Sequence, residues 1–120
     1  MNRHQLDLYE LALANQYTIA RARSGQETLA VALAERPDVI VLDVLMPGQE
    51  DGFTTCAKLH EHPGTATIPV LLLTAHDGVD LEARAVSAGA TMLLHKPCPA
   101  ERLALTINAA ISVRNLASGG

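Results

Sequence analysis

The strongest constraint on the fold is a repeated alternation between short apolar runs and longer segments whose apolar residues are spaced as on a helix. Four short runs predict strands at residues 17–22, 39–43, 68–74 and 91–96. The segments between and around them predict five helices, at residues 4–15, 24–34, 53–61, 79–88 and 99–114. Strands that are joined by helices run parallel, so the sequence predicts an α/β domain with helices on both faces of a parallel sheet.

Composition limits the size of this unit and the classes of partner. The chain has 120 residues and 48% apolar residues, which is enough for one domain with its own core. Lys and Arg number 9 against 13 Asp and Glu, and this net charge of −4 argues against direct binding of nucleic acid or an anionic membrane. No apolar stretch approaches the roughly 18 residues of a membrane span. Two isolated cysteines, Cys56 and Cys98, suit a reducing compartment, so we expect a cytoplasmic location.

A single polar residue ends each of three apolar runs. "VIVLD" ends in Asp43, "VLLLT" in Thr74 and "MLLHK" in Lys96. The carboxyl ends of parallel strands share one edge of a sheet, so these side chains are expected to converge where ligands bind in such folds. A carboxylate can attack a phosphoryl group, while an ammonium and a hydroxyl can meet the oxygens of that group. Gly-rich nucleotide-binding motifs and the hydrolase motif G-x-S-x-G are absent from the sequence, and Leu45 stands where an aspartate-nucleophile phosphatase has a second Asp.

These residues carry a resemblance to a known family. "VIVLDVLMPGQEDGF", "PVLLLTAHD" and "SAGATMLLHKPC" resemble the receiver domain of bacterial two-component response regulators, over nearly the whole chain. The resemblance implies that a histidine kinase or phosphotransfer protein phosphorylates Asp43, with Thr74 and Lys96 assisting. It also implies that Asp43 and the backbone carbonyl of Leu45 hold Mg²⁺, and that phosphorylation changes the face formed by residues 79–114. That face would contact an output domain or a second copy.

Two further features come with the resemblance. Met46-Pro47 and Asp51-Gly52 match the loop that follows the phosphoacceptor, and "MPGQEDG" is one residue longer than usual. Lys96-Pro97 matches a bond that is usually cis in the family, as an X-Pro amide allows.

The start of the chain departs from the family pattern. A receiver opens with an apolar strand that ends in two acidic Mg²⁺ ligands, and this sequence begins just past that pair. We therefore expect a flavodoxin-like, doubly wound sheet that lacks its first, interior strand, and a receiver domain over residues 1–120 that is truncated at its N-terminus. Alternatives are that residues 17–22 and 39–43 rearrange, or that another chain supplies the strand. Mg²⁺ binding would be weakened or lost, because Asp7 is expected to lie on a solvated helix face.

Two functions fit these observations. The first is a phosphorylatable signalling receiver, which is not an enzyme beyond its own phosphoryl transfer and dephosphorylation. The alternative is a pseudo-receiver that binds partners without phosphorylation. Two positions bear on the first function. Leu93 stands where the family commonly has an aromatic switch residue, and His76 is at a position that can tune the lifetime of the phosphoryl group in the family.

Overall fold

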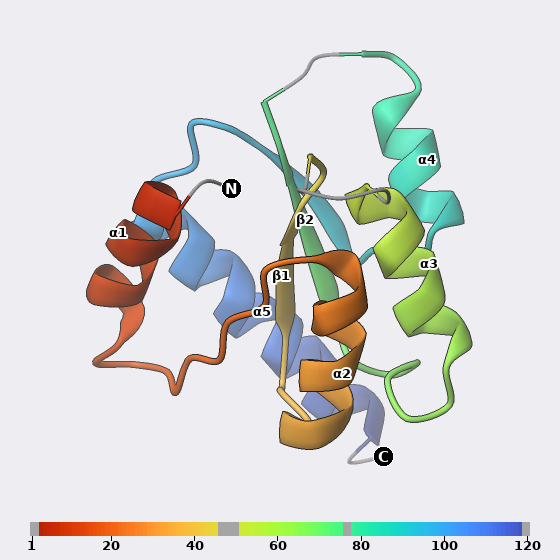
Figure 1. Ribbon diagram of the computed structural model, residues 1–120, viewed down its shortest axis with the longest axis horizontal. Helices are drawn as coiled ribbons and strands as arrows, with labels where there is room; N and C mark the ends of the chain where they lie inside the picture. Colours follow the sequence, from red (N-terminus) through yellow and green to blue (C-terminus); the bar gives the residue numbers. More distant parts are fainter. Residues whose placement is uncertain (1–2, 46–50, 76–77, 119–120) are drawn as a thin grey trace.

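The computed structural model describes residues 3–45, 51–75 and 78–118, in which helices pack on both sides of a parallel sheet (Figure 1). The sheet of this described part has the order β1-β2-β3, and both strand pairs are parallel. In chain order the elements are α1 (Arg3–Leu13), α2 (Gly25–Glu35), β1 (Ile40–Asp43), α3 (Gly52–Glu61), β2 (Val70–Thr74), α4 (Leu81–Ser87), β3 (Met92–His95) and α5 (Ala100–Ser118). The five helices and the last three strands of the sequence prediction are therefore confirmed.

β2 is the central strand, and all five of its residues are buried. Its register places Leu72 between Leu42 of β1 and Leu93 of β3. Continuous apolar sequence is typical of a parallel strand that is covered by helices on both faces, and β2 fits this description. The carboxyl ends of all three strands consequently lie at one edge of the sheet.

The strand that was predicted at residues 17–22 is not formed. These residues lie outside any ladder, and within the described residues β1 pairs with β2 and not with this segment. A strand needs a neighbouring backbone to bond, and the predicted strand order offers this segment only the first, interior strand. Side chains hold the segment instead: Tyr17 and Ile19 pack against the core, and Arg21 pairs with Asp7 at 2.5 Å and with Glu10 at 2.9 Å. Arg21 therefore lies outside any strand of the described residues.

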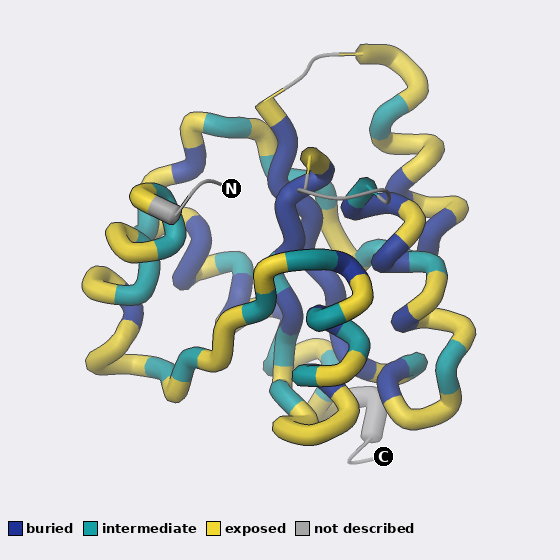
Figure 2. The backbone as a smooth tube through the Cα atoms, in the orientation of Figure 1, coloured by how far each residue is buried: buried dark blue, intermediate teal, exposed yellow. Residues whose placement is uncertain are grey.

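The sheet separates two apolar cores (Figure 2). One lies under α2, α3 and α4 and is called here the α3-side core; its buried residues are Ala32, Ile40, Leu42, Val44, Phe53, Cys56, Leu59, Ile68, Val70, Leu72, Ala85 and Ala88. The other lies under α1 and α5 and is called the α5-side core; its buried residues are Leu13, Leu71, Leu73, Cys98, Leu103, Ala104, Ile107 and Ala110. Successive residues of β2 alternate between the two cores, as strand geometry requires.

Helix starts on the α3 side follow local signals in the sequence. The Ser24 hydroxyl accepts a hydrogen bond from the backbone N–H of Glu27 at 3.1 Å, which confirms the predicted start of α2. The inner face of this helix carries Thr28 and Ala32, which are buried, and Leu29, which packs on the core, whereas Leu33 is exposed. In the part of the chain that is described, no helix is long and apolar enough to cross a membrane.

Candidate functional site

Asp43 is the last residue of β1, and only 7% of it is exposed. Removing a carboxylate from water is costly unless a charge partner or hydrogen-bond donors replace the water. The Nζ of Lys96 lies 2.6 Å from the Asp43 Oδ2, and the backbone N–H of Leu45 donates to the Oδ1 at 3.1 Å. The apolar strand can therefore end in a buried carboxylate because an ammonium and an amide meet it there.

Lys96 reaches this carboxylate from the residue that follows β3. Its backbone N–H donates to the carbonyl of Thr74 at 2.7 Å, which holds the Lys96 main chain beside the end of β2. The Lys96–Pro97 bond is cis, as the resemblance implied. Burial lowers the pKa of the Lys96 ammonium, although the ion pair with Asp43 remains well within hydrogen-bonding distance. Two residues that are 53 positions apart in the sequence thus form one buried pair.

Thr74 is the third strand-end residue of the sequence prediction, and it is 1% exposed at the end of β2. The register pairs Asp43 with Leu73, so Thr74 lies one residue beyond Asp43 on the neighbouring strand. It also pairs with His95, directly before Lys96. The three residues therefore come from the ends of three adjacent strands.

The loop after Asp43 returns to the strand through Gly52. The Gly52 N–H donates to the carbonyl of Val44 at 2.8 Å, and a Cβ at Gly52 would lie 2.4 Å from the carbonyl oxygen of Asp43. Any side chain at this position would displace the backbone of Asp43. Residues 46–50, which include the predicted Met46-Pro47 landmark, lie outside the described residues, as does His76.

Asp51 starts α3 and connects this loop to α4. Its carboxylate accepts a hydrogen bond from the N–H of Thr54 at 2.9 Å, and Arg84 of α4 lies 3.4 Å away. Arg84 also stacks over the ring of Phe53, with its guanidinium carbon 4.3 Å from the ring centroid. Burial alone would raise the pKa of Asp51, but the Thr54 bonds and the charge of Arg84 outweigh it and leave this pKa below its ordinary value.

The described residues do not fit a complete Mg²⁺ site. Mg²⁺ prefers several hard oxygen ligands in octahedral geometry. Asp43 supplies a carboxylate here and Leu45 could add its carbonyl, but no group of three or more His, Cys, Asp or Glu residues in the described ranges could hold a metal ion. Asp7 pairs with Arg21, as expected of a residue on a helix face away from the site.

Sequence reasoning missed two residues of α1 that border the site. The Gln5 Oε1 accepts a hydrogen bond from the Lys96 Nζ at 3.5 Å, and the Tyr9 hydroxyl donates to the carbonyl of Cys98 at 2.6 Å. Their four-residue spacing puts both on the same side of α1, but this spacing does not indicate which distant residues they meet.

Comparison with known proteins shows the family of this chain. Residues 2–108 match the family model of the response regulator receiver domain. The chain belongs to this family. It is 45% identical over 84 residues to the response regulator PleD of Caulobacter vibrioides, which covers 70% of this chain and 18% of PleD. It is 40% identical over 90 residues to the response regulator MprA of Mycobacterium tuberculosis, covering 74% of this chain and 37% of MprA. This receiver chain thus spans less than two fifths of either curated relative.

Solved structures show the same fold. The signal receiver domain of a signal transduction histidine kinase from Syntrophus aciditrophicus superposes with a TM-score of 0.82 and 32% identity, covering 92% of this chain and 84% of that one. A CheY-like receiver domain protein from Methanospirillum hungatei has a TM-score of 0.86 at 19% identity, covering 95% and 90%, and supports the fold alone. The predicted flavodoxin-like, doubly wound class is therefore confirmed, with three strands among the described residues.

The family has consequences at the general level. Receiver domains act in phosphorylation-based signalling as phosphoacceptor domains rather than as conventional enzymes, and they generally bind Mg²⁺ at an acidic pocket.

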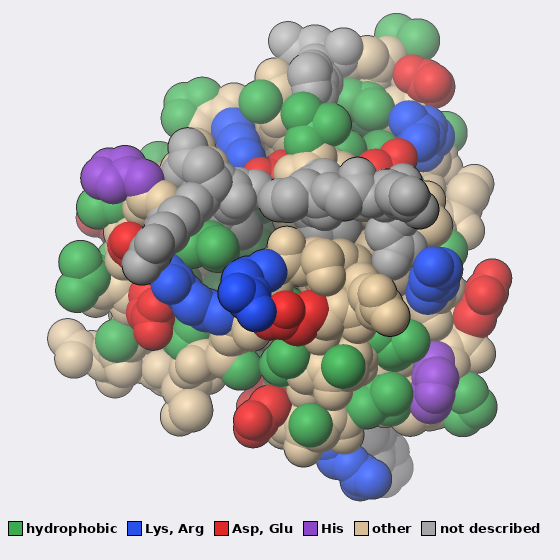
Figure 3. All heavy atoms as spheres, in the orientation of Figure 1, with side chains coloured by type: hydrophobic (Ala, Val, Ile, Leu, Met, Phe, Trp, Pro, Cys, Tyr) green, Lys and Arg blue, Asp and Glu red, His purple; other side chains and the backbone are tan. Residues whose placement is uncertain are grey.

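On the face in Figure 3, Lys and Arg side chains are interspersed with Asp and Glu, so this face presents no concentrated basic surface of the kind that binds nucleic acid.

Proposed function

We propose that this receiver accepts a phosphoryl group on Asp43 from a histidine kinase or a phosphotransfer protein, and that residues 1–120 act as one signalling domain. The observation that carries the proposal is the 2.6 Å contact between the Lys96 ammonium and the Asp43 carboxylate at the carboxyl edge of the sheet. This contact supports the proposal, because a carboxylate oxygen that could act as a nucleophile lies beside a positive charge.

The chemistry follows from the donor. An oxygen of Asp43 attacks the phosphorus of a phosphohistidine, the O–P bond forms, and the P–N bond breaks as the imidazole leaves and takes up a proton. The transferred group carries its negative charge on three oxygens. Lys96 offsets part of that charge, and the Thr74 hydroxyl, one strand away, can donate to one of those oxygens. Hydrolysis of the resulting acyl phosphate restores the carboxylate of Asp43 and releases phosphate.

The face that would transmit the change is formed by α4, β3 and α5. Several apolar side chains are exposed on these elements: Val86, Met92, Leu105 and Val113. We propose that this face binds an output domain or a second copy of the chain when Asp43 is phosphorylated. A change in oligomeric state on phosphorylation, measured by light scattering, would support the second copy as the partner.

The test of phosphorylation uses a small phosphodonor and Mg²⁺. We expect intact mass spectrometry to show the gain of one phosphoryl group in the wild type, and beryllofluoride to shift the NMR signals of residues near Asp43. Asp43→Asn should abolish both effects, whereas the matched Asp80→Asn change at the exposed start of α4 should leave them intact. Phosphorylation that persists in Asp43→Asn would refute the assignment of the acceptor.

One observation favours the alternative of a pseudo-receiver. The described residues bring a single carboxylate, that of Asp43, to the site, and this is a poor donor set for Mg²⁺. If this second function holds, the wild type will gain no phosphoryl group from any donor and will bind its partner equally well with Asp43→Asn. Comparison of the wild type with Asp43→Asn therefore separates the two functions.

A further inference from the structure

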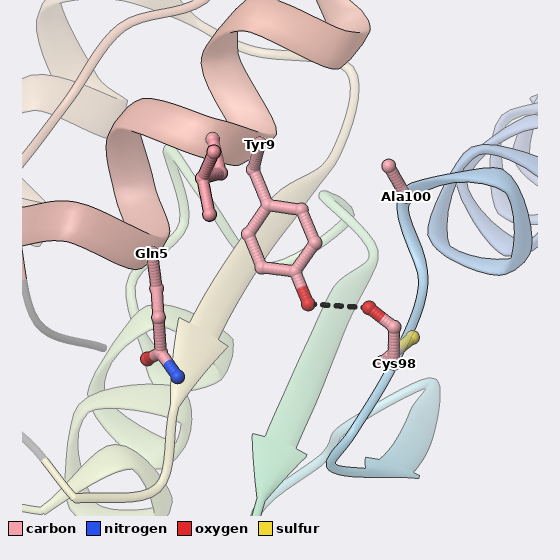
Figure 4. A pocket seen from close by; sticks show the side chains of 5 residues that line it. Gln5, Tyr9, Cys98 and Ala100 are labelled. Carbon is pink, nitrogen blue, oxygen red and sulfur yellow. Dashed lines mark hydrogen bonds between the residues drawn. The ribbon is translucent and has the colours of Figure 1, made fainter.

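α1 contacts the segment after β3 at two points. The Lys96 ammonium donates to the Gln5 side-chain oxygen at 3.5 Å, and the Tyr9 hydroxyl donates to the Cys98 carbonyl at 2.6 Å. Gln5 and Tyr9 are one helical turn apart, so both side chains leave the same side of α1 (Figure 4). They meet residues that are two positions apart in the following segment. One helix face therefore holds both the side chain of Lys96 and the main chain just beyond it.

These hydrogen bonds matter because packing alone leaves space at this place. A partly open pocket of about 260 Å³ lies between α1 and the start of α5, lined by Gln5, Leu8, Tyr9, Cys98 and Ala100. A segment that borders such a pocket has fewer packing partners on that side and shifts more readily. The bond from Tyr9 thus adds a directional constraint on the Cys98 main chain to the packing of the buried Cys98 side chain.

The direction of the Lys96 side chain needs such support. The bond from its backbone N–H to Thr74 holds the main chain, but four rotatable bonds separate that main chain from the ammonium. Asp43 is one anchor for the ammonium and Gln5 is the second. When a phosphoryl group occupies Asp43, the carboxylate loses charge and Lys96 must turn to the phosphoryl oxygens. The neutral amide of Gln5 keeps the Lys96 ammonium near the site. A second carboxylate would instead compete with the phosphoryl oxygens for this ammonium.

We propose that Gln5 and Tyr9 are positioning residues that hold Lys96 at the phosphoacceptor site, a role that rests on the proposed function of Asp43. Neither residue needs to touch the transferred group. Gln5 acts on the ammonium directly, and Tyr9 acts through the Cys98 main chain. The first helix of the chain thereby contributes to a site whose predicted residues all lie at strand ends.

The test measures how accessible the Lys96 amine is. The chain has two lysines, and the exposed Lys58 on α3 serves as an internal reference. An amine-reactive label at fixed pH, followed by peptide mass spectrometry, gives the ratio of the Lys96 rate to the Lys58 rate. We expect Gln5→Ala and Tyr9→Phe each to raise this ratio roughly three- to tenfold, the factor for loss of one hydrogen bond.

Matched controls are available on the same molecule. Tyr17→Phe removes the other tyrosine hydroxyl, which bonds Asn108 and the carbonyl of Ala104 on α5, away from Lys96. Gln26→Ala removes an exposed amide at the start of α2. Both controls should leave the ratio unchanged. An unchanged ratio in Gln5→Ala and Tyr9→Phe, or equal acceleration at both lysines, would overturn the proposal.

A second arm links the positioning role to phosphoryl transfer. Gln5→Ala and Tyr9→Phe should slow phosphorylation by a small phosphodonor severalfold, with no further slowing when Lys96 is already replaced by Ala. Additional slowing in the Lys96→Ala background would show that the two residues act by another route, against the proposal. If the wild type accepts no phosphoryl group at all, the proposed function fails, and the labelling ratio still decides whether α1 positions Lys96.

Discussion

The two sides of the sheet are stabilised in different ways. On the α3 side, the helices contribute completely buried residues, with Cys56 and Leu59 at 0% exposure against Leu72 of β2. On the α5 side, the completely buried residues are Leu71 and Leu73 of β2 and Leu103 of α5, and many of the surrounding side chains are only partly buried: Tyr9, Tyr17, Ile19, Val39, Val41, Leu94 and Ile111.

Hydrogen bonds from side chains to distant backbone carbonyls are prominent on the α5 side. Tyr9 bonds Cys98, Tyr17 bonds Ala104, and Arg114 bonds the carbonyls of Pro37 and Asp38 ahead of β1. The α3 side is closed mainly by packing, and the α5 side combines looser packing with these polar contacts. The difference suggests that the α5 side, which includes α1 and the segment after β3, can adjust with less loss of buried contacts. That is also the side from which Lys96 is positioned.

Two adjacent leucines of β2 test this difference most directly. Leu71 faces the α5-side core, Leu72 faces the α3-side core, and both are 0% exposed. Truncating a buried leucine costs about 2–5 kcal/mol, and the cost falls when the surroundings can close over the cavity. We expect Leu72→Ala to lie near the upper end of this range and Leu71→Ala to cost at least about 1 kcal/mol less. Urea unfolding of both variants measures the free energies, and an equal or larger loss in Leu71→Ala would contradict the comparison.

The two cysteines offer a second matched pair. Cys56 is 0% exposed in the α3-side core, and burial raises the pKa of its thiol to about 11. Cys98 borders the pocket beside α1; burial raises its pKa as well, but the charge of Arg102 acts in the opposite direction. The thiolate is the reactive form, so we expect iodoacetamide to modify Cys98 at least about tenfold faster than Cys56 at pH 8. Cys56→Ala and Cys98→Ala variants give each rate separately by mass spectrometry, and faster modification of Cys56 would show that the α3 side opens more readily.

Much of this architecture could be predicted from the sequence where it depends on the burial of apolar runs, the shared edge of parallel strands and contacts between residues close in the chain. The runs at 39–43, 68–74 and 91–96 became strands within two residues of the expected ends. Burial explains the continuous apolar sequence of β1 and β2, whereas β3 is only partly buried. The nearness of Asp43 and Lys96 followed from the shared edge of parallel strands. Ser24 capped α2 because its hydroxyl needs only a backbone N–H three residues away.

The rest depended on partners that are distant in the sequence. Residues 17–22 have the composition of a strand, but without a neighbouring strand in the described residues they form no strand. Gln5 and Tyr9 contact residues that are 91 and 89 positions away. No periodicity within α1 predicts which residue of the opposite end of the chain will meet them. The sequence pattern could predict the residues at the strand ends, but it could not predict the hydrogen bonds that α1 makes to Lys96 and Cys98.

The helix caps on the α3 side are expected to give the smallest change in the free energy of unfolding, and for one of them this change depends on pH. Asp51 caps α3 through the N–H of Thr54 with a charged acceptor, whereas Ser24 caps α2 with a neutral one. Removing either cap by mutation to Ala should cost about 1 kcal/mol at pH 7. Asp51→Asn should cost less, because an amide oxygen caps nearly as well and only the interactions of the charge are lost.

The pH dependence separates the two caps. The pKa of Asp51 is lower in the folded protein than its ordinary value of 3.8, so the folded state favours the ionised form. The resulting stabilisation is complete above pH 3.8 and is lost as the pH falls through the folded pKa. We therefore expect the difference in unfolding free energy between wild type and Asp51→Asn to shrink below about pH 4, while the effect of Ser24→Ala stays constant. If the difference in unfolding free energy between wild type and Asp51→Asn is independent of pH, the charge of Asp51, including its pair with Arg84, contributes nothing to the stability of the α3 side.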